Sequence, residues 1–128
     1  MAANMMVGGY RLEDRFGQLD NSVKIDMLKK MYQVRHFEQQ TEQFIIRGMI
    51  HGTCHLCIGQ EATAIGAISA AGREDYITST HRGHGHCIGK GADLKLMMAE
   101  LLGRSTGYCR GRGGSMHIAD LDSGNLGA

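Results

Sequence analysis

The sequence of 128 residues contains no proline, no tryptophan and no long apolar run. Because a bilayer-spanning helix needs about 20 predominantly apolar residues, the missing run argues against a membrane protein. The start of the chain, Met1 to Gly9, is too short and too poor in leading positive charge for a secretory signal peptide. These absences predict a cytoplasmic protein.

The sequence also has no marked excess of charge of either sign, because it contains 14 basic and 13 acidic residues and its formal net charge is +1. A balance so close to zero gives no electrostatic reason to expect nucleic acid or an anionic membrane as the main partner. The length and a hydrophobic fraction of 42% fit one soluble globular domain with a single core.

The four cysteines are too few for the disulfide framework of a small secreted domain. Cys54 and Cys57 form a Cys-x-x-Cys pair, but Cys87 and Cys109 lie 22 residues apart rather than in a second close pair. The main interpretation is that all four are small buried hydrophobes. A small Cys/His metal-binding module is the alternative from another functional class.

A long helix is predicted from Ser22 to Arg47. The side-chain oxygens of residues 20–22 are available as N-caps, and Gly48 follows as a C-cap. Apolar residues and one threonine recur at spacings of three and four, which places them on one face. The residues of this stripe are Leu28, Met31, Val34, Phe37, Thr41, Phe44 and Ile45.

A second helix is predicted from Gln60 to Ala71, ended by Gly72, and a third beginning at Asp93 and closed by Gly103. The second is rich in small residues, namely alanine, glycine and serine, so we expect it to be buried tightly against a sheet or another subunit. The third would turn Leu94, Met97, Met98 and Leu101 inward. Between the two, the β-favouring run Tyr76–Thr80 predicts a short strand.

Residues 1–20 show no periodicity and are predicted to form a mobile arm, while residues 21–128 form one domain. The last 25 residues, 104–128, contain six glycines and predict a functional loop or unfinished structure. The expected fold class is α/β, mostly helical in this segment with few short strands.

The densest group of chemically active side chains is His81-Arg82-Gly83-His84-Gly85-His86. Arginine offers a forked donor to phosphate oxygens, histidine donates or moves protons, and glycine lets the backbone approach a ligand. The pattern predicts a flexible loop that binds an anion. A solvated polar turn is one alternative, and a metal site using His84 and His86 is another, although no nearby carboxylate completes a ligand set.

Two further groups favour anion binding. His55 precedes the N-terminus of the predicted second helix, where backbone donors attract anions. Glu61 in the first turn either complements the helix dipole or is an internal acid near a cofactor ring. The segment Arg110–His117 suggests a phosphate cradle or a surface against a partner. It lacks the lysine of a P-loop, and one short arginine-glycine copy is poor evidence for RNA binding.

Four segments belong together: His55–Ala62, Thr78–His86, Met98–Leu101 and Gly113–Asp120. In their order and spacing they resemble the alpha subunits of thiamine-dependent 2-oxoacid and acetoin dehydrogenase complexes. The resemblance extends from about Leu28 to Ala128. The forms of the second and fourth segments look more like acetoin dehydrogenase than mitochondrial pyruvate dehydrogenase, which tends to have Tyr-Arg in place of His81-Arg82.

The resemblance implies the N-terminal part of a pyrophosphate-type thiamine-diphosphate-binding domain, in an oxidoreductase that works as a heterotetramer with a beta subunit. By resemblance, His81 and Arg82 contact the cofactor pyrophosphate and His55 lies beside it. His84 and His86 are candidate catalytic residues at the substrate entrance, as proton donors or acceptors. The segment Gly113–His117 would line that entrance or the subunit contact.

The implied reaction is oxidative cleavage of acetoin, with the acetyl group passed to a lipoyl group of the acyltransferase component. A pyruvate dehydrogenase alpha subunit is the close alternative, and a catalytically inactive truncated fragment is another. Magnesium is expected with the cofactor, but no aspartate here occupies the family's Gly-Asp-Gly segment, so its ligands are absent from this chain. The isolated chain is therefore predicted to be inactive.

Overall fold

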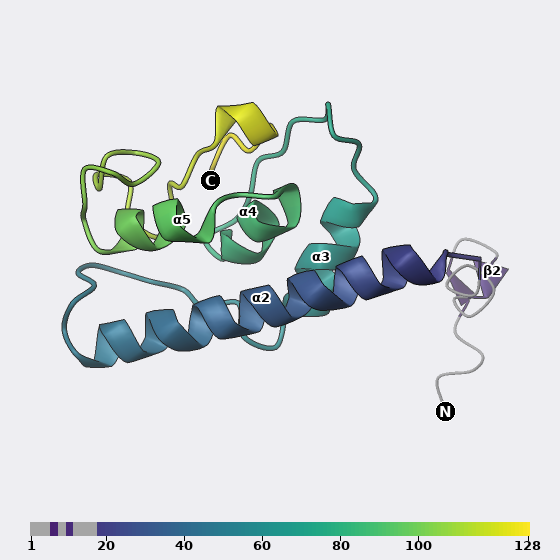
Figure 1. The fold of residues 1–128 in the computed structure, drawn as a ribbon, viewed down its shortest axis with the longest axis horizontal. Helices are drawn as coiled ribbons and strands as arrows, with labels where there is room; N and C mark the ends of the chain where they lie inside the picture. The colour runs from purple at the N-terminus through teal and green to yellow at the C-terminus, as the bar shows by residue number, and fades with distance from the viewer. Residues whose placement is uncertain (1–5, 8–9, 12–17) are drawn as a thin grey trace.

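The computed structural model describes residues 6–7, 10–11 and 18–128, and within them the chain is mostly helical (Figure 1). This confirms the predicted predominance of helix. The sheet of the described part is a two-stranded pair, so the α/β character is limited to short strands. In chain order the elements are β1 (Met6–Val7), β2 (Tyr10–Arg11), α2 (Asn21–Ile46), α3 (Glu61–Ser69), α4 (His84–Lys90), α5 (Leu94–Leu101) and the 3-10 turn η1 (Leu121–Ser123).

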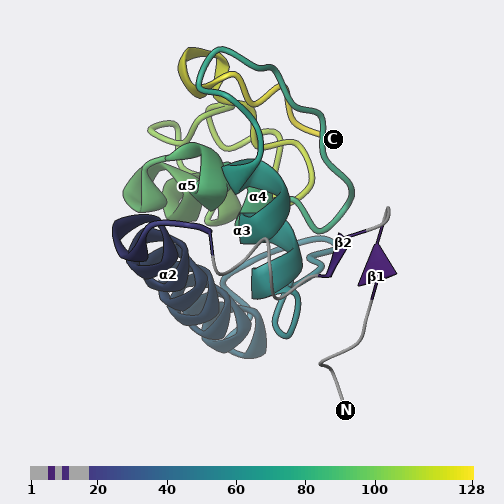
Figure 2. The ribbon, with the colours of Figure 1, turned by 90° about the vertical axis from the view of Figure 1, so that its right-hand side faces the viewer.

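Helix α2 runs along one side of the molecule, and α3, α4 and α5 lie together on its other side (Figures 1 and 2). Helices α3 and α4 contact each other and α2. The core lies between these helices and includes residues from the loops that connect them. It consists of Val34, Phe37, Ile50, Cys57, Ile65, Cys87, Ile88, Ala92, Met97, Leu101 and Ile118.

The predicted first helix is confirmed as α2, with bounds one residue from those expected. Gly48 follows the helix end with φ of +68°, the left-handed conformation that glycine adopts most readily. The middle of the predicted stripe is buried, at Val34, Phe37 and Thr41. Leu28 was expected on the same face but is 53% exposed, because it borders the groove between α2 and the start of α3.

The predicted second helix is confirmed as α3, but it packs against helices rather than against a sheet. One face, with Glu61, Ala64 and Ile65, is buried. Its small residues on the other side, including Ala62 and Ala67, are exposed. The expected complete burial is therefore not found in this chain.

Helix α4 corrects the prediction of a flexible loop for residues 84–86, while residues 81–83 lie outside any helix or strand. Glycine disfavours helix by about 1 kcal/mol relative to alanine, which is why the pattern read as a loop. Here glycine allows close helix packing instead. A Cβ at Gly85 would lie 2.7 Å from Cβ of Ala64, and one at Gly89 would lie 3.0 Å from Ile68. The packing against α3 therefore outweighs the weak helix propensity.

The predicted strand Tyr76–Thr80 is wrong as a strand, because only Ile77 forms an isolated parallel bridge, with Asn125. The segment is extended and exchanges backbone hydrogen bonds with residues 124–127. Its partner contains Gly124 and Gly127, which have φ of +78° and +88°. Two left-handed residues among the four residues 124–127 interrupt a regular ladder of hydrogen bonds. The β propensity of residues 76–80 was therefore not sufficient to form a strand.

The predicted third helix is confirmed as α5, with Asp93 as its N-cap. The carboxylate of Asp93 accepts hydrogen bonds from the backbone N–H groups of Lys95 at 2.7 Å and Leu96 at 3.3 Å. Met97 and Leu101 are buried as expected. Among the described helices, none combines the length and the apolar character that crossing a bilayer requires.

The predicted arm, residues 1–20, lies mostly outside the described residues, so its mobility stays a prediction. Within it, β1 pairs with β2 in antiparallel register, Met6 with Arg11 and Val7 with Tyr10. The sequence pattern did not predict this pair.

The close contact between α3 and α4 gives a first prediction. Gly85→Ala should lower the free energy of unfolding by about 1–3 kcal/mol, because the added methyl overlaps Ala64 and Cys57. Gly66→Ala in α3 is the matched control, since a Cβ there meets nothing within 4 Å and should stabilise the helix by about 0.5–1 kcal/mol. Thermal denaturation measures both. Equal changes in the two variants would contradict this packing.

Candidate functional site

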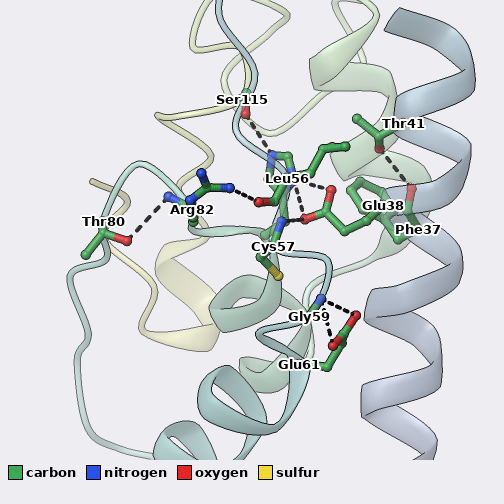
Figure 3. Close-up of polar contacts among 11 residues, drawn as sticks. Phe37, Glu38, Thr41, Leu56, Cys57, Gly59, Glu61, Thr80, Arg82 and Ser115 are labelled. Atoms are coloured by element: carbon green, nitrogen blue, oxygen red, sulfur yellow. Dashed lines mark hydrogen bonds and ion pairs between the residues drawn. The ribbon is translucent and has the colours of Figure 1, made fainter. Parts of the chain in front are cut away.

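The three predicted cofactor-binding residues lie close together. The rings of His55 and His81 meet edge to face with centroids 4.7 Å apart. Arg82 donates a hydrogen bond from Nη1 to the carbonyl oxygen of Leu56, the residue after His55 (Figure 3). His81 is exposed, while His55 and Arg82 are half-buried. The 54–57 turn and the turn at residues 81–82, just before α4, therefore place two imidazoles and one guanidinium together.

His84 is enclosed within the fold and is only 1% exposed. Its Nδ1 lies 3.0 Å from both carboxylate oxygens of Glu38, and its Nε2 lies 3.0 Å from Oγ of Ser115. The rings of Phe37 and His84 meet edge to face, with their centroids 5.6 Å apart. Both ring nitrogens thus have protein partners. The expected position on an open entrance is not observed in this chain, and a catalytic role for His84 stays a prediction.

His86 occupies a different environment from His84. Its Nδ1 lies 2.6 Å from Oγ of Ser79, and burial lowers the pKa of His86 below its usual value. The imidazole is therefore neutral near pH 7 and can accept a proton. Because residues two apart on a helix point in different directions, His84 and His86 do not share the face that the metal alternative required.

Glu38 is the site residue that the sequence interpretation missed. Its side chain is completely buried, and Oε1 accepts a hydrogen bond of 3.0 Å from the backbone N–H of Cys57 as well as facing His84. A signal was present, since Glu38 lies four residues after Val34 and three before Thr41, both on the buried stripe. A charged residue on that stripe indicates a buried ion that needs partners.

Glu61 is anchored by α2 and by its own turn. Its carboxylate accepts hydrogen bonds from Arg35 Nε at 2.5 Å and from the N–H of Gly59 at 3.1 Å. The hydrogen bond from Arg35 is the main reason that the pKa of Glu61 is lowered to about 2. A carboxylate that is ionised at neutral pH does not fit the alternative of an internal acid. It fits stabilisation of the turn and the helix start.

The glycine-rich segment after α5 is folded around the carboxylate of Glu100. The backbone N–H groups of Cys109, Gly111, Gly113 and Gly114 donate to its two oxygens at 2.7–3.2 Å. Burial opposes ionisation of Glu100, but these four donors outweigh it and lower its pKa. The prediction of a phosphate cradle is therefore corrected for these four groups. They already bind an internal anion.

The side chain of Ser115 connects this glycine-rich segment to His84. Ser115 also lines a cavity of about 380 Å³ between residues 111–117 and 51–53. The residue as a whole is buried, at 7% exposure. The Glu38–His84–Ser115 chain therefore extends from the interior of α2 to the wall of a cavity.

The four cysteines are free thiols. Burial raises the pKa of Cys57 to about 12 and that of Cys87 to about 11, so neither is a reactive thiolate at neutral pH. The interpretation as small buried hydrophobes holds for these two, whereas Cys54 and Cys109 are only half-buried. Within the part of the chain that the structure describes, no three His, Cys, Asp or Glu side chains come together as metal ligands. The metal-module alternative has no support there.

The family model of the dehydrogenase E1 component matches residues 29–126. The chain belongs to this family. The match runs from within α2 through η1, and it includes every residue of the site described above. The sequence resemblance to this family is thereby confirmed.

Similar proteins within the E1 family are named as alpha subunits. The chain is 54% identical over 102 residues to the acetoin:2,6-dichlorophenolindophenol oxidoreductase alpha subunit of Bacillus subtilis (strain 168), covering 80% of this chain and 31% of that protein. It is 46% identical over 110 residues to the subunit of that name from Cupriavidus necator, covering 86% and 33%. The pyruvate dehydrogenase E1 alpha subunit of Zymomonas mobilis is 44% identical over 101 residues, covering 77% and 28%.

The chain thus spans about a third or less of the length of these relatives. What the relatives' names say of acetoin and pyruvate therefore applies to the longer proteins. The match places this chain in the family, and the site described here lies wholly within the shared segment.

The Glu61 contacts predict a specific acid sensitivity. The pKa of Glu61 is about 2 in the folded chain against an ordinary 4.5, so its stabilisation is complete above pH 4.5. It is lost as the pH falls from about 4.5 to about 2. Glu61→Gln should lower the free energy of unfolding at pH 7 by about 1–3 kcal/mol. It should also reduce the acid limb, which is the fall in the free energy of unfolding between about pH 4.5 and about pH 2. Chemical denaturation across the pH range measures this.

The control is Glu42→Gln, which changes an exposed glutamate on α2. It should leave the acid limb of the parent intact. If the two variants lose stability in parallel as the pH falls, the assignment of this limb to Glu61 is wrong.

Proposed function

We propose that this chain forms the diphosphate-binding part of the alpha subunit of a thiamine-diphosphate-dependent acetoin dehydrogenase. The observation that supports it best is the convergence of His55, His81 and Arg82 within the segment shared with the E1 family. The fold proposed for the whole domain is the pyrophosphate-type thiamine-diphosphate-binding fold, in a cytoplasmic protein.

The donor set fits a diphosphate. A guanidinium has five N–H donors, and Arg82 uses Nη1 to bind the Leu56 carbonyl, which leaves other donors for phosphate oxygens. His81 is exposed and His55 is half-buried beside it, so both rings are available as further donors. Magnesium is proposed to accompany the diphosphate, held by residues outside these 128. When bound, thiamine diphosphate supplies the nucleophilic carbon that cleaves the bond beside the substrate carbonyl.

The chain's own residues then have distinct tasks. Arg82 neutralises diphosphate charge, and the two imidazoles at 55 and 81 donate hydrogen bonds to it. His84 and His86 are proposed to transfer protons at the substrate entrance. His86 would act as a neutral base, because burial lowers its pKa. His84 would act through the hydroxyl of Ser115, which lines the cavity bordered by residues 111–117.

Acetoin is preferred over pyruvate because the two acetoin-named relatives are 54% and 46% identical, against 44% for the pyruvate dehydrogenase alpha subunit of Zymomonas mobilis. The sequence forms around His81-Arg82 and Gly113–Asp120 support the same preference. In the proposed reaction the acetyl group passes to a lipoyl group of the acyltransferase component. A pyruvate dehydrogenase alpha subunit with the same cofactor site is the alternative.

A beta subunit is the proposed principal partner, in a heterotetramer. The relatives are named as alpha subunits. Helix α2 also exposes several large apolar side chains along its length, which is typical of a surface that packs in a larger assembly. These exposed residues are Val23, Ile25, Leu28, Tyr32 and Ile46.

Replacing the guanidinium tests the proposed function. In the full-length gene product assembled with its beta subunit, Arg82→Ala should weaken thiamine diphosphate binding by roughly 10- to 100-fold, because a charge-assisted contact is lost. Isothermal titration of the cofactor, with magnesium present, measures the affinity.

Arg73→Ala is the control, since Arg73 is an exposed arginine in the turn after α3. It should bind the cofactor as the parent does. Equal affinities for the Arg82 variant and the parent would refute the diphosphate role of Arg82.

A further inference from the structure

The proposed function gives no task to the most deeply buried carboxylate near the site. Glu38 has no exposed surface, and burying an ion is costly unless hydrogen bonds compensate. Its oxygens receive the backbone N–H of Cys57 at 3.0 Å and Nδ1 of His84 at 3.0 Å. Cys57 follows Leu56, which accepts the hydrogen bond from Arg82, and His84 follows Arg82 itself by two residues. The carboxylate therefore binds next to both partners of the Arg82–Leu56 hydrogen bond.

One peptide group lies between Glu38 and Arg82. The N–H of Cys57 donates to the Glu38 carboxylate, and the C=O of Leu56 accepts from the Arg82 guanidinium (Figure 3). This N–H and this C=O belong to the same peptide bond, which is planar and rigid. They point in opposite directions, so the anion and the cation sit at the two ends of one peptide dipole.

The two charges orient this peptide group in the same sense. A negative charge at the N–H end and a positive charge at the C=O end both stabilise the observed direction of the dipole. Each hydrogen bond polarises the group and strengthens the other, an effect that grows where water is excluded. Rotating the peptide would lose both contacts together. The acceptor for Arg82 is thus fixed by a residue that Arg82 does not touch.

Glu38 also fixes the backbone that carries Arg82. His84 follows Arg82 by two residues, and its Nδ1 faces the same carboxylate. The proton on that nitrogen donates to Glu38, which leaves Nε2 to accept from the hydroxyl of Ser115 when the ring is neutral. One carboxylate on α2 therefore positions the start of α4 as well as the 54–57 turn.

We infer that Glu38 is a positioning residue for Arg82, acting through the Leu56–Cys57 peptide group so that the guanidinium is set in advance for a diphosphate. This inference rests on the proposed function for the identity of the ligand. Fixing a donor before binding increases affinity, because less conformational freedom is lost when the ligand arrives. Glu38 itself does not touch the ligand.

Glutamine is the informative replacement at position 38. It keeps the size and shape of glutamate, but one carboxylate oxygen becomes an NH2 donor. Oε1 faces both the Cys57 N–H and His84 Nδ1, whereas Oε2 faces only His84. Glu38→Gln can therefore keep an oxygen acceptor for Cys57, but it loses the charge and places an NH2 donor against His84. Glu42→Gln, one helical turn further along α2 and exposed, is the matched control.

A double-mutant cycle tests the inference with thiamine diphosphate as the probe. Parent, Glu38→Gln, Arg82→Ala and the double variant are prepared as the full-length product with its beta subunit. We expect Glu38→Gln to weaken binding about tenfold in the parent and less than twofold in the Arg82→Ala background. The thermal midpoint of each variant is recorded separately, because a purely structural role would lower it without coupling to Arg82.

Additive losses in the two backgrounds, or no loss in either, would overturn the inference and leave the proposed function intact. A parent that does not bind thiamine diphosphate would overturn both, and the parent titration alone identifies that case. If Glu38→Gln does not fold by circular dichroism, Glu38→Asp replaces it in the same cycle. The shorter carboxylate keeps the charge, and the same coupling with Arg82 is expected from it.

Discussion

The arrangement of the candidate site depends on the burial of one carboxylate. Glu38 projects from α2 with no exposed surface, and it binds the 54–57 turn through Cys57 and the start of α4 through His84. His55 lies in the first of these segments, and His81 and Arg82 lie directly before the second. The three convergent donors are therefore held by the two contacts of Glu38. Because an unpaired buried charge is strongly unfavourable, the carboxylate favours only those conformations in which both donors are in place. The ion thus selects one geometry for the site.

A second buried carboxylate performs a similar task for the glycine-rich segment. Glu100, on α5, accepts four backbone N–H groups from residues 109–114, and Gly107 lies so close to its backbone that a Cβ would come within 2.5 Å. A segment with almost no regular structure is therefore ordered by an anion rather than by a sheet. Ser115 then joins it to His84. Two internal anions, one on α2 and one on α5, position the loops around the site.

The sequence predicted those features that depend on local pattern. Apolar spacing with Gly48 placed α2, and apolar spacing with Gly103 placed α5. The His-Arg-Gly cluster contained two of the three convergent donors, His81 and Arg82. Features that depend on tertiary contacts were missed. Helix α4 forms because Gly85 and Gly89 allow close contact with α3. Helix propensities of single residues do not include such tertiary contacts. The segment 76–80 lacked a regular partner strand. Glu38 and Glu100 both lie on the buried faces of their helices, so a rule that treats a charge on an apolar stripe as a buried ion would have found them.

Hydrogen exchange at the Cys57 amide tests most directly whether the Glu38 carboxylate organises the site. This N–H lies in a turn outside any helix or strand, and the carboxylate is its hydrogen-bond acceptor. We predict slow exchange, with protection comparable to that at Phe37 in the buried interior of α2, and loss of that protection in Glu38→Ala, which removes the acceptor. Exchange in the parent at the rate of an unprotected turn would contradict it.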